Sequence, residues 1–349
     1  MKTGRSLEEL AAEIERRRDA KHDYLVDTAH LKMQESEGGP MLVYGDDTFG
    51  INRLAHRQIG DRIGVPAKYY DRMLDSAPHL LRENVNHWLA ASAEERLIRT
   101  LDGNVRAFLS NRYQRIDNEE VAEFILPALA EVPDIQFVST EITASRMYIK
   151  AVTPRVTGEV TVGDEVQAGV IISNSEVGMG AITVSPLVLR LVCTNGMALP
   201  DSTYRKNHVG ARITKDENIA GLLSDEAKRA DDRAILLKMR DVVHAALDAT
   251  VFKRTVDRLR DAKSMKLEGD PVVAVRELAA KSGLDKKEET GVLRYLIEGG
   301  DLSRYGMIQA VTRYAQDPSD YDRASELEYL GGKILDLPKK DWEVLQKAA

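Results

Sequence analysis

The stretch EVQAGVIISNSEVGMGAITVSPLVLRLVCTNG, residues 165–196, contains two strongly apolar runs. Residues 166–172 and 182–193 are rich in the β-branched side chains that fit a pleated, half-buried surface. The connection between them, residues 173–180, is polar and carries glycines, which is typical where a chain reverses between paired strands. The pattern predicts a long hairpin at the centre of a sheet.

Three positions in or after the second run carry further information. Pro186 cannot donate to a strand ladder, so it predicts an edge position or a bulge. Arg190 lies among apolar neighbours, and its charge either reaches the rim of the sheet or faces a ligand across it. At Asn195-Gly196, asparagine followed by glycine favours positive φ and predicts a turn.

The composition is that of an ordinary soluble protein. The 349 residues are 43% hydrophobic and 30% charged, enough for two domains or for one domain with a helical annex. The formal net charge is -7, so an anionic partner would need a local basic face. The single cysteine, Cys193, excludes a disulfide framework or a thiolate zinc cluster, and we expect a buried structural thiol. No apolar run approaches the roughly 20 residues that span a bilayer, so we expect a cytoplasmic protein that makes no membrane contact.

The segments before the central hairpin give local signals of both helix and strand. Ser6 opens a capping box and predicts the start of a helix, and residues 51–91 predict two or three short helices. Residues 97–109 indicate two strands joined by Asp102-Gly103 in a type I′ turn. This is a specific hairpin signal.

A helix and two more strands follow that hairpin. Asn118, with acidic residues after it, marks the start of the helix. Residues 135–142 and 146–152 have strand patterns. From residue 96 the order is therefore two strands, a helix and four strands, which predicts one mixed sheet with a helix on one face.

The chain changes character after residue 196. Residues 203–215, which include Arg212 and Lys215, form its most basic window, and residues 218–266 carry apolar side chains at helical spacing. We therefore predict an α+β protein with a central, mostly antiparallel sheet and a packed helix, followed by a C-terminal all-helical region. The predicted domains are a mainly helical region at 1–92, a β-hairpin-rich α+β core at 93–217 and a helical annex at 218–349.

The common catalytic motifs are absent from the sequence. It has no GxxxxGK[ST], GxGxxG, GxSxG or HExxH pattern, and its seven histidines form no i, i+4 pair. We therefore predict no catalytic residue, no metal and no cofactor, which makes binding the expected function. An enzymatic alternative remains at Asn174, Ser175 and Glu176, a polar loop at the end of buried strands.

Basic and aromatic side chains are interleaved along the predicted sheet. Positions 96–115 carry five arginines and a tyrosine against the single Asp102. Arg146, Tyr148 and Lys150 alternate onto one face of a strand. A single-stranded nucleic acid needs this pattern, because cations meet phosphates and rings stack on bases; the alternative is an ordinary solvated sheet face. The residues expected to contact a strand are Arg106, Arg112, Tyr113, Arg115, Arg146, Tyr148, Lys150, Arg190, Arg205 and Lys206.

Several blocks of the sequence resemble one known family. RAFLSNRY at 106–113, NSEVGMGA at 174–181 and RLVCTNGM at 190–197 are similar to the signature blocks of the phage and plasmid family called domain of unknown function 932. IQAVT at 308–312 resembles its C-terminal block, with Gln309 where asparagine is expected. The resemblance covers most of the chain and implies a phage or mobile-element origin, but the family has no settled activity.

The order of elements is also similar to that of the single-strand annealing recombinases of the Red-beta, Erf and Rad type. That resemblance implies a protein that binds single-stranded DNA in a basic groove, anneals it without a nucleotide cofactor, and forms a homo-oligomeric ring or filament. A second possibility is a non-catalytic phage protein that binds a host or phage protein through its helical annex. In that case the basic residues are merely solvated.

Overall fold

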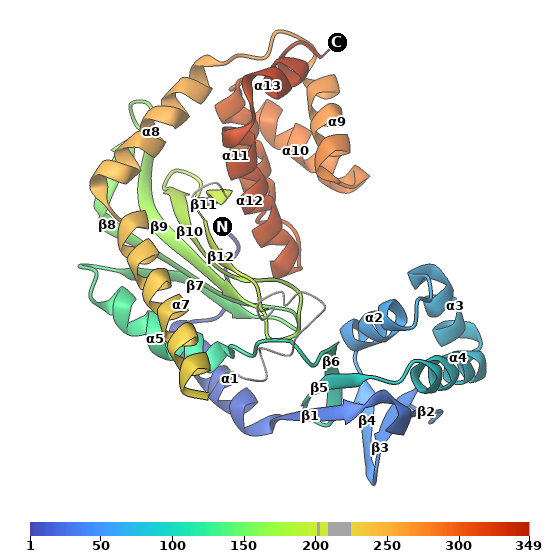
Figure 1. Ribbon diagram of the computed structural model, residues 1–349. Helices are drawn as coiled ribbons and strands as arrows, with labels where there is room; N and C mark the ends of the chain where they lie inside the picture. Colours follow the sequence, from blue (N-terminus) through green and yellow to red (C-terminus); the bar gives the residue numbers. More distant parts are fainter. Residues whose placement is uncertain (201–202, 209–224, 349) are drawn as a thin grey trace.

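Two β-sheets with packed helices and a C-terminal helical annex make up the computed structural model, which describes residues 1–200, 203–208 and 225–348 (Figure 1). The N-terminal sheet lies at one end of the molecule, and the annex lies at the other end against the central sheet (Figure 1). The predicted α+β class is confirmed. In the described part of the chain after β12, every named element is a helix, as expected for the C-terminal region.

The N-terminal sheet has the strand order β1-β5-β6-β4-β3-β2. The β4 and β6 pair is parallel, and the other described pairs are antiparallel. Leu42, Ile98 and Phe108 of the sheet pack in one core with Tyr70 and Leu81 of the helices. The elements are β1 (Lys21–Asp27), η1 (Thr28–His30), β2 (Leu31–Gln34), β3 (Met41–Tyr44), β4 (Asp47–Ile51), α2 (Arg53–Arg62), α3 (Ala67–Ser76), α4 (Pro78–Ala91), β5 (Glu95–Leu101) and β6 (Asn104–Ser110).

The hairpin predicted at residues 97–109 is present as β5 and β6. Asp102 and Gly103 have φ of 50° and 74°, both positive as a type I′ turn requires. The prediction that this hairpin shares one mixed sheet with the central strands is wrong, since β5 pairs with β1 in the N-terminal sheet. The sequence of β1, KHDYLVD, gives no clear strand signal, because apolar and polar residues do not alternate along it. In the structure Val26 is the one fully buried residue of this strand.

The central sheet contains the predicted long hairpin as β9 and β10. Its strand order is β7-β8-β9-β10-β11, and β12 also pairs with β10. The hairpin register runs from Thr183 opposite Ser173 to Arg190 opposite Val166. The strands are β7 (Gln136–Ile142), β8 (Met147–Glu159), β9 (Glu165–Asn174), β10 (Ile182–Arg190), β11 (Asn195–Ala198) and β12 (Tyr204–Lys206).

Pro186 lies opposite a gap on the outer side of β10. On that side β12 pairs with residues 182–184 and β11 with residues 187–190. The Pro186 carbonyl accepts the Leu199 N–H from the same side. Because the N–H and C=O of one residue in an antiparallel strand point the same way, the missing N–H also lies on this outer side, and the ladder between β9 and β10 loses no bond.

Helices cover both faces of the central sheet (Figure 1). Met147 and Ile149 of β8 enter the main core with α5 and α7, whereas Tyr148 and Lys150 face α12. The chain before α1 lies along β7, where Arg5 forms an antiparallel bridge with Thr140. The helices are α1 (Leu7–Ala20), α5 (Asn118–Ala130), α7 (Asp225–Ala246), α8 (Ala249–Ser264), α9 (Pro271–Ser282), α10 (Lys286–Gly299), α11 (Arg304–Tyr314), α12 (Tyr321–Asp336) and α13 (Lys339–Gln346).

A buried ion pair fixes α12 on the sheet. Lys150 Nζ lies 2.6 Å from Glu328 Oε2, and both side chains are 0% exposed. The same nitrogen lies 4.6 Å from the centroid of the Tyr321 ring. Burial alone would lower the pKa of Lys150, but the Glu328 carboxylate raises it above its ordinary value. This expected DNA contact therefore points into the protein.

Replacement of Lys150 by methionine should lower the free energy of unfolding by about 3–5 kcal/mol, because Glu328 would be left buried without a counter-charge. The double variant Lys150→Met, Glu328→Leu should recover most of the loss, since an apolar pair carries no desolvation cost. Urea denaturation followed by circular dichroism measures both variants. Equal stability of the single and double variants would contradict this account.

Candidate functional site

A buried charge network lies where the N-terminal sheet meets the central sheet. Its centre is Arg99 of β5, whose side chain is 0% exposed and whose Nε donates to Asp23 Oδ1 at 2.8 Å. Arg99 Nη2 lies 2.7 Å from Asp117 Oδ1, and Nη1 donates to the Glu176 carbonyl at 2.9 Å. Burial alone would lower the pKa of Arg99, but Asp117 and Asp23 raise it, so the guanidinium stays charged.

A second buried pair continues the network. Arg106 Nη1 lies 2.7 Å from Glu176 Oε2. Glu176 Oε1 accepts the backbone N–H of Asn118 at 2.8 Å, and a helix N-terminus such as that of α5 favours a carboxylate. Arg106 Nε and Nη2 have no hydrogen-bond partner among the described residues. The expected DNA contact Arg106 is therefore an interior residue in this conformation.

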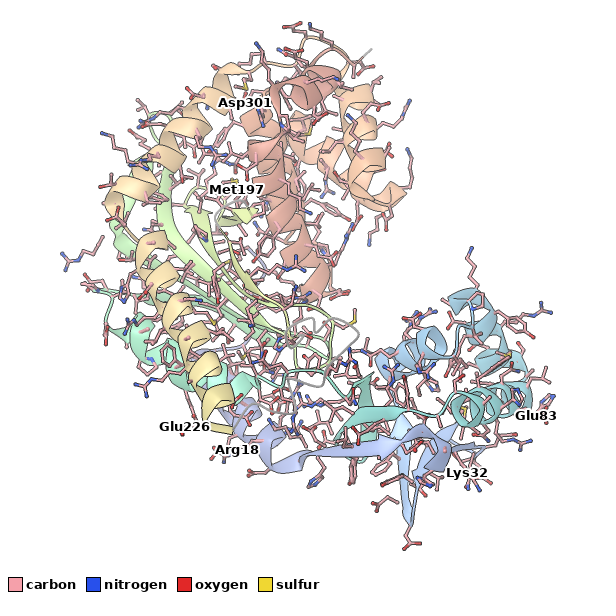
Figure 2. The ribbon with its side chains drawn as sticks, in the orientation of Figure 1. Arg18, Lys32, Glu83, Met197, Glu226 and Asp301 are labelled. Atoms are coloured by element: carbon pink, nitrogen blue, oxygen red, sulfur yellow. The ribbon has the colours of Figure 1, made fainter. Side chains whose placement is uncertain are left out.

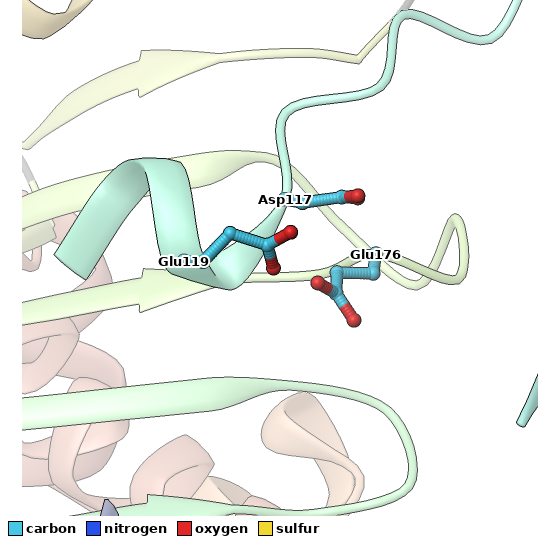
Figure 3. Close-up of side chains that lie close together, drawn as sticks. All are labelled: Asp117, Glu119 and Glu176. Atoms are coloured by element: carbon cyan, nitrogen blue, oxygen red, sulfur yellow. The ribbon is translucent and has the colours of Figure 1, made fainter. Parts of the chain in front are cut away.

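Three carboxylates gather beside α5 (Figure 3). Asp117, Glu119 and Glu176 offer oxygens that lie within 4.8 Å of one another, a set that could hold a divalent cation. The ammonium group of Lys21 already lies among them, 2.6 Å from Asp117 Oδ2, 2.6 Å from Glu119 Oε1 and 3.8 Å from Glu176 Oε1. Burial would lower the pKa of Lys21, but Asp117 and Glu119 raise it, so the ammonium group stays charged. Together with Arg99 on Asp117 and Arg106 on Glu176, it balances the three carboxylates.

Buried side chains hold the loop that follows β9. Asn174 Nδ2 donates to the Ile116 carbonyl at 3.0 Å and to Asn118 Oδ1 at 2.9 Å. Ser175 Oγ donates to the Ser145 carbonyl at 2.8 Å. Asn174 and Ser175 are fully buried. The side chains of the enzymatic alternative are therefore directed inward, and a substrate could reach them only after the loop opens.

Two segments with expected DNA contacts lie side by side near this network. The rings of Tyr113 and His208 stack with their centroids 5.2 Å apart and an interplanar angle of 15°. The Gln114 N–H donates to the His208 carbonyl at 2.6 Å. Burial lowers the pKa of His208, so the stacked imidazole is neutral at pH 7. The stack brings together the exposed Arg112 and Arg115 on one segment and Arg205 and Lys206 of β12 on the other.

A groove of about 520 Å³ lies between the central sheet and α12. Its sheet side contains three of the expected contacts, Arg146, Tyr148 and Arg205. Of these, Tyr148 is only 4% exposed and packs against the ring of Tyr321, so it is a core residue and not an open stacking surface. Its helix side contributes Tyr329 and Lys333. Arg205 and Lys333 are exposed, so their charges can reach a ligand in the groove. Arg146 is half-buried, and its Nη2 donates to the Met179 carbonyl.

Two acidic side chains of α12 also line the groove. Asp322 accepts a hydrogen bond from the Thr143 hydroxyl at 3.1 Å. Glu326 lies 2.6 Å from Arg323 Nη1, which shares its charge. The groove therefore has a mixed lining with a modest excess of positive charge.

The remaining expected contacts lie elsewhere. Lys150 is buried beneath α12, and Arg190 lies at the opposite end of β10 from the β12 pairing. Cys193 is half-buried in the turn after β10, which corrects the expectation of a buried thiol within the strand. The reason is that β10 ends at Arg190 while the apolar run of the sequence continues. Arg212 and Lys215 lie outside the described residues.

Several residues of the network and groove were not expected from the sequence. No sequence pattern distinguishes Lys21 or Asp117. Tyr329 and Lys333 belong to a helix, and the periodicity of that helix does not show which of its faces packs against the sheet. Arg99 did carry a signal. It directly follows Leu97 and Ile98 in a strand, a setting in which a charge needs a buried partner.

The fold and the buried network define a two-sheet α+β protein whose central hairpin is tied to a helix N-terminus by paired charges. The family model Domain of unknown function (DUF932) matches residues 106–315, and the chain belongs to that family. No curated protein and no solved structure matches the chain. Within the described ranges, no helix is both long and apolar enough to cross a membrane.

Removal of the Lys21 ammonium group should turn the acid cluster into a cation site. In Lys21→Met the carboxylates of Asp117 and Glu119 repel each other, so we expect a loss of about 3 kcal/mol in stability, part of which millimolar Ca²⁺ should restore. Lys32→Met, which changes an exposed lysine of β2 (Figure 2), is the matched control. Thermal melts with Ca²⁺ and with EDTA measure the effect. Equal Ca²⁺ stabilisation of the unchanged protein would show that the cluster binds cations in spite of Lys21.

Proposed function

We propose that the protein binds single-stranded DNA in the groove between the central sheet and α12. The observation that supports this best is that Arg146 and Arg205, expected as contacts from separate parts of the sequence, line one groove. Lys333 of α12 adds a further cation. The volume of the groove falls within the range of about 300–1,000 Å³ that is common for ligand sites.

The lining suits a phosphate backbone with occasional base stacking. Arg205 and Lys333 meet phosphates, and the half-buried ring of Tyr329 offers a face to a base. The Tyr329 hydroxyl lies 2.8 Å from Ser185 Oγ, which fixes the orientation of the ring. A strand held mainly by its phosphates keeps its base edges free to pair with a complementary strand, as annealing requires.

We further propose that several copies act together in a phage or other mobile element. One groove contacts only a short segment of single-stranded DNA, whereas annealing needs a longer segment of DNA held in an extended conformation. A homo-oligomeric ring or filament places successive grooves along the same strand. Stacking in the product duplex supplies about 1.4 kcal/mol per base step, so strand pairing proceeds without a nucleotide cofactor.

A groove in the annex favours a second candidate function, binding of a host or phage protein. It has a volume of about 720 Å³ and lies between α9, α12 and α13. An amphipathic helix lays its apolar face into grooves of this kind. The aliphatic lining consists of Leu278, Leu284, Leu327, Leu330, Ile334, Leu337 and Leu345.

The double variant Arg146→Ala, Arg205→Ala should bind single-stranded oligonucleotides of all sequences more weakly. The slope of log affinity against log salt should fall by about 0.7 for each lost phosphate contact. Fluorescence anisotropy over a salt series measures both, with a duplex as the comparison ligand. Arg276→Ala, which removes an exposed arginine of α9, is the matched control. Unchanged affinity in the double variant would exclude the groove.

A second double variant, Arg112→Ala with Arg115→Ala, tests whether the strand continues past the Tyr113 and His208 stack. We expect weaker binding that is again independent of sequence, because both arginines are exposed. Annealing of complementary strands, followed by fluorescence energy transfer, should fall in step with binding. If both double variants bind as the unchanged protein does, the annex groove becomes the better candidate.

A further inference from the structure

A cavity of about 320 Å³ opens where the turn between β10 and β11 meets α8, α10 and α11. Asp301, labelled in Figure 2, lines it at the annex end of the molecule. The cavity and the groove beside α12 share no lining residue. The two are therefore separate sites.

Three cations line this cavity: Arg190 of β10, Lys263 of α8 and Arg313 of α11. Arg190 Nε and Nη2 donate to the Asp164 carboxylate at 2.6 Å and 3.1 Å, which fixes the plane of the guanidinium. The remaining nitrogen, Nη1, donates to Cys193 Sγ at 3.5 Å. Because sulfur is a weak acceptor, an oxyanion would be the stronger partner for this N–H group.

Two tyrosine rings hold these cations in the cavity wall. Arg190 Cζ and Lys263 Nζ lie 5.9 Å and 5.5 Å from the centroid of the Tyr305 ring. Arg313 Cζ lies 5.5 Å from the centroid of the Tyr295 ring. Burial raises the pKa of Tyr305, so its hydroxyl stays neutral and adds no negative charge. The rings also offer flat faces to a planar ligand.

The acidic residues of the lining are engaged in part by cations outside it. Asp301 Oδ1 lies 2.9 Å from Lys266 Nζ, while Asp301 Oδ2 lies 3.8 Å from Lys263 Nζ of the lining itself. Glu298 Oε1 lies 3.9 Å from Arg294 Nε. Neither Lys266 nor Arg294 lines the cavity. The lining therefore keeps a local excess of positive charge in a chain of net charge -7, which is the condition for selective anion capture.

We propose that this cavity binds a small molecule through an oxyanion, either a phosphate or a carboxylate. The oxyanion meets Arg190 Nη1, Lys263 and Arg313. Asn195 and Gln309, whose Nδ2 and Oε1 atoms lie 3.2 Å apart, supply amide groups for the polar body of the ligand. This binding activity is independent of the proposed DNA groove, whose cations lie elsewhere.

Cys193 makes the test specific to the cavity, because it lines the cavity and is the one cysteine of the chain. The full chain is reacted with N-ethylmaleimide, an uncharged thiol reagent, and intact mass is followed with time. Sodium phosphate, citrate or adenosine monophosphate is added at constant ionic strength. A ligand with a Kd of about 1 mM, present at about 10 mM, should slow alkylation roughly tenfold and in a saturable way.

The anion that protects identifies the oxyanion class: phosphate and adenosine monophosphate for a phosphate site, citrate for a carboxylate site. The double variant Lys263→Gln, Arg313→Gln should react at the unprotected rate whether or not the anion is present. Arg276→Gln, on the exposed face of α9, should keep the protection. A thermal melt shows that each variant is folded.

Calorimetric titration of Cys193→Ser with the protecting anion gives a second measurement that does not depend on the thiol. Heat of binding in this variant, and its loss when Lys263→Gln and Arg313→Gln are added, would support the site. Two results would overturn the proposal. One is the lack of saturable protection by any of the three anions. The other is protection that survives in the Lys263→Gln, Arg313→Gln variant.

Discussion

The relative placement of the two sheets depends on the burial of Arg99. A guanidinium removed from water costs several kcal/mol unless carboxylates and carbonyls surround it. Here the partners come from β1, from the residue before α5 and from the loop after β9. The N-terminal sheet cannot rotate against the central sheet without leaving a buried charge uncompensated. Lys21 and Arg106 extend the same constraint to the neighbouring carboxylates.

This network also explains why the family blocks recognised in the sequence occur in separate places. Arg106 lies in the block at 106–113, and Asn174 and Glu176 lie in the block at 174–181, at the end of β9 and in the loop after it. In the folded chain Arg106 pairs with Glu176, and Asn174 donates to Asn118. The blocks at 106–113 and 174–181 therefore meet in one hydrogen-bonded junction. A role in holding the sheets together accounts for the buried polar side chains of these two blocks.

The sequence was most informative where local chemistry decides the structure. The β5 and β6 turn needs positive φ at Asp102 and Gly103, and the start of α5 at Asn118 follows from its capping acids. The strands β1 and β4 could not be predicted, because they are short and their buried and exposed positions do not alternate. Alternation placed Lys150 on the correct face of β8, yet only the fold shows that α12 covers that face. The groove beside α12 was therefore predictable from its sheet side alone.

The bridge between Arg5 and Thr140 bears on how copies of this chain can associate. The Arg5 N–H donates to the Thr140 carbonyl at 2.6 Å, and the Thr140 N–H donates to the Arg5 carbonyl at 3.3 Å. Open backbone groups on an outer strand recruit other chains into continuous sheets. At this point of β7 those groups are already bonded within the chain. A neighbouring copy therefore cannot add a strand to the central sheet here without displacing the N-terminal segment. Loss of that segment would expose unpaired backbone groups of β7 to which another chain can bind.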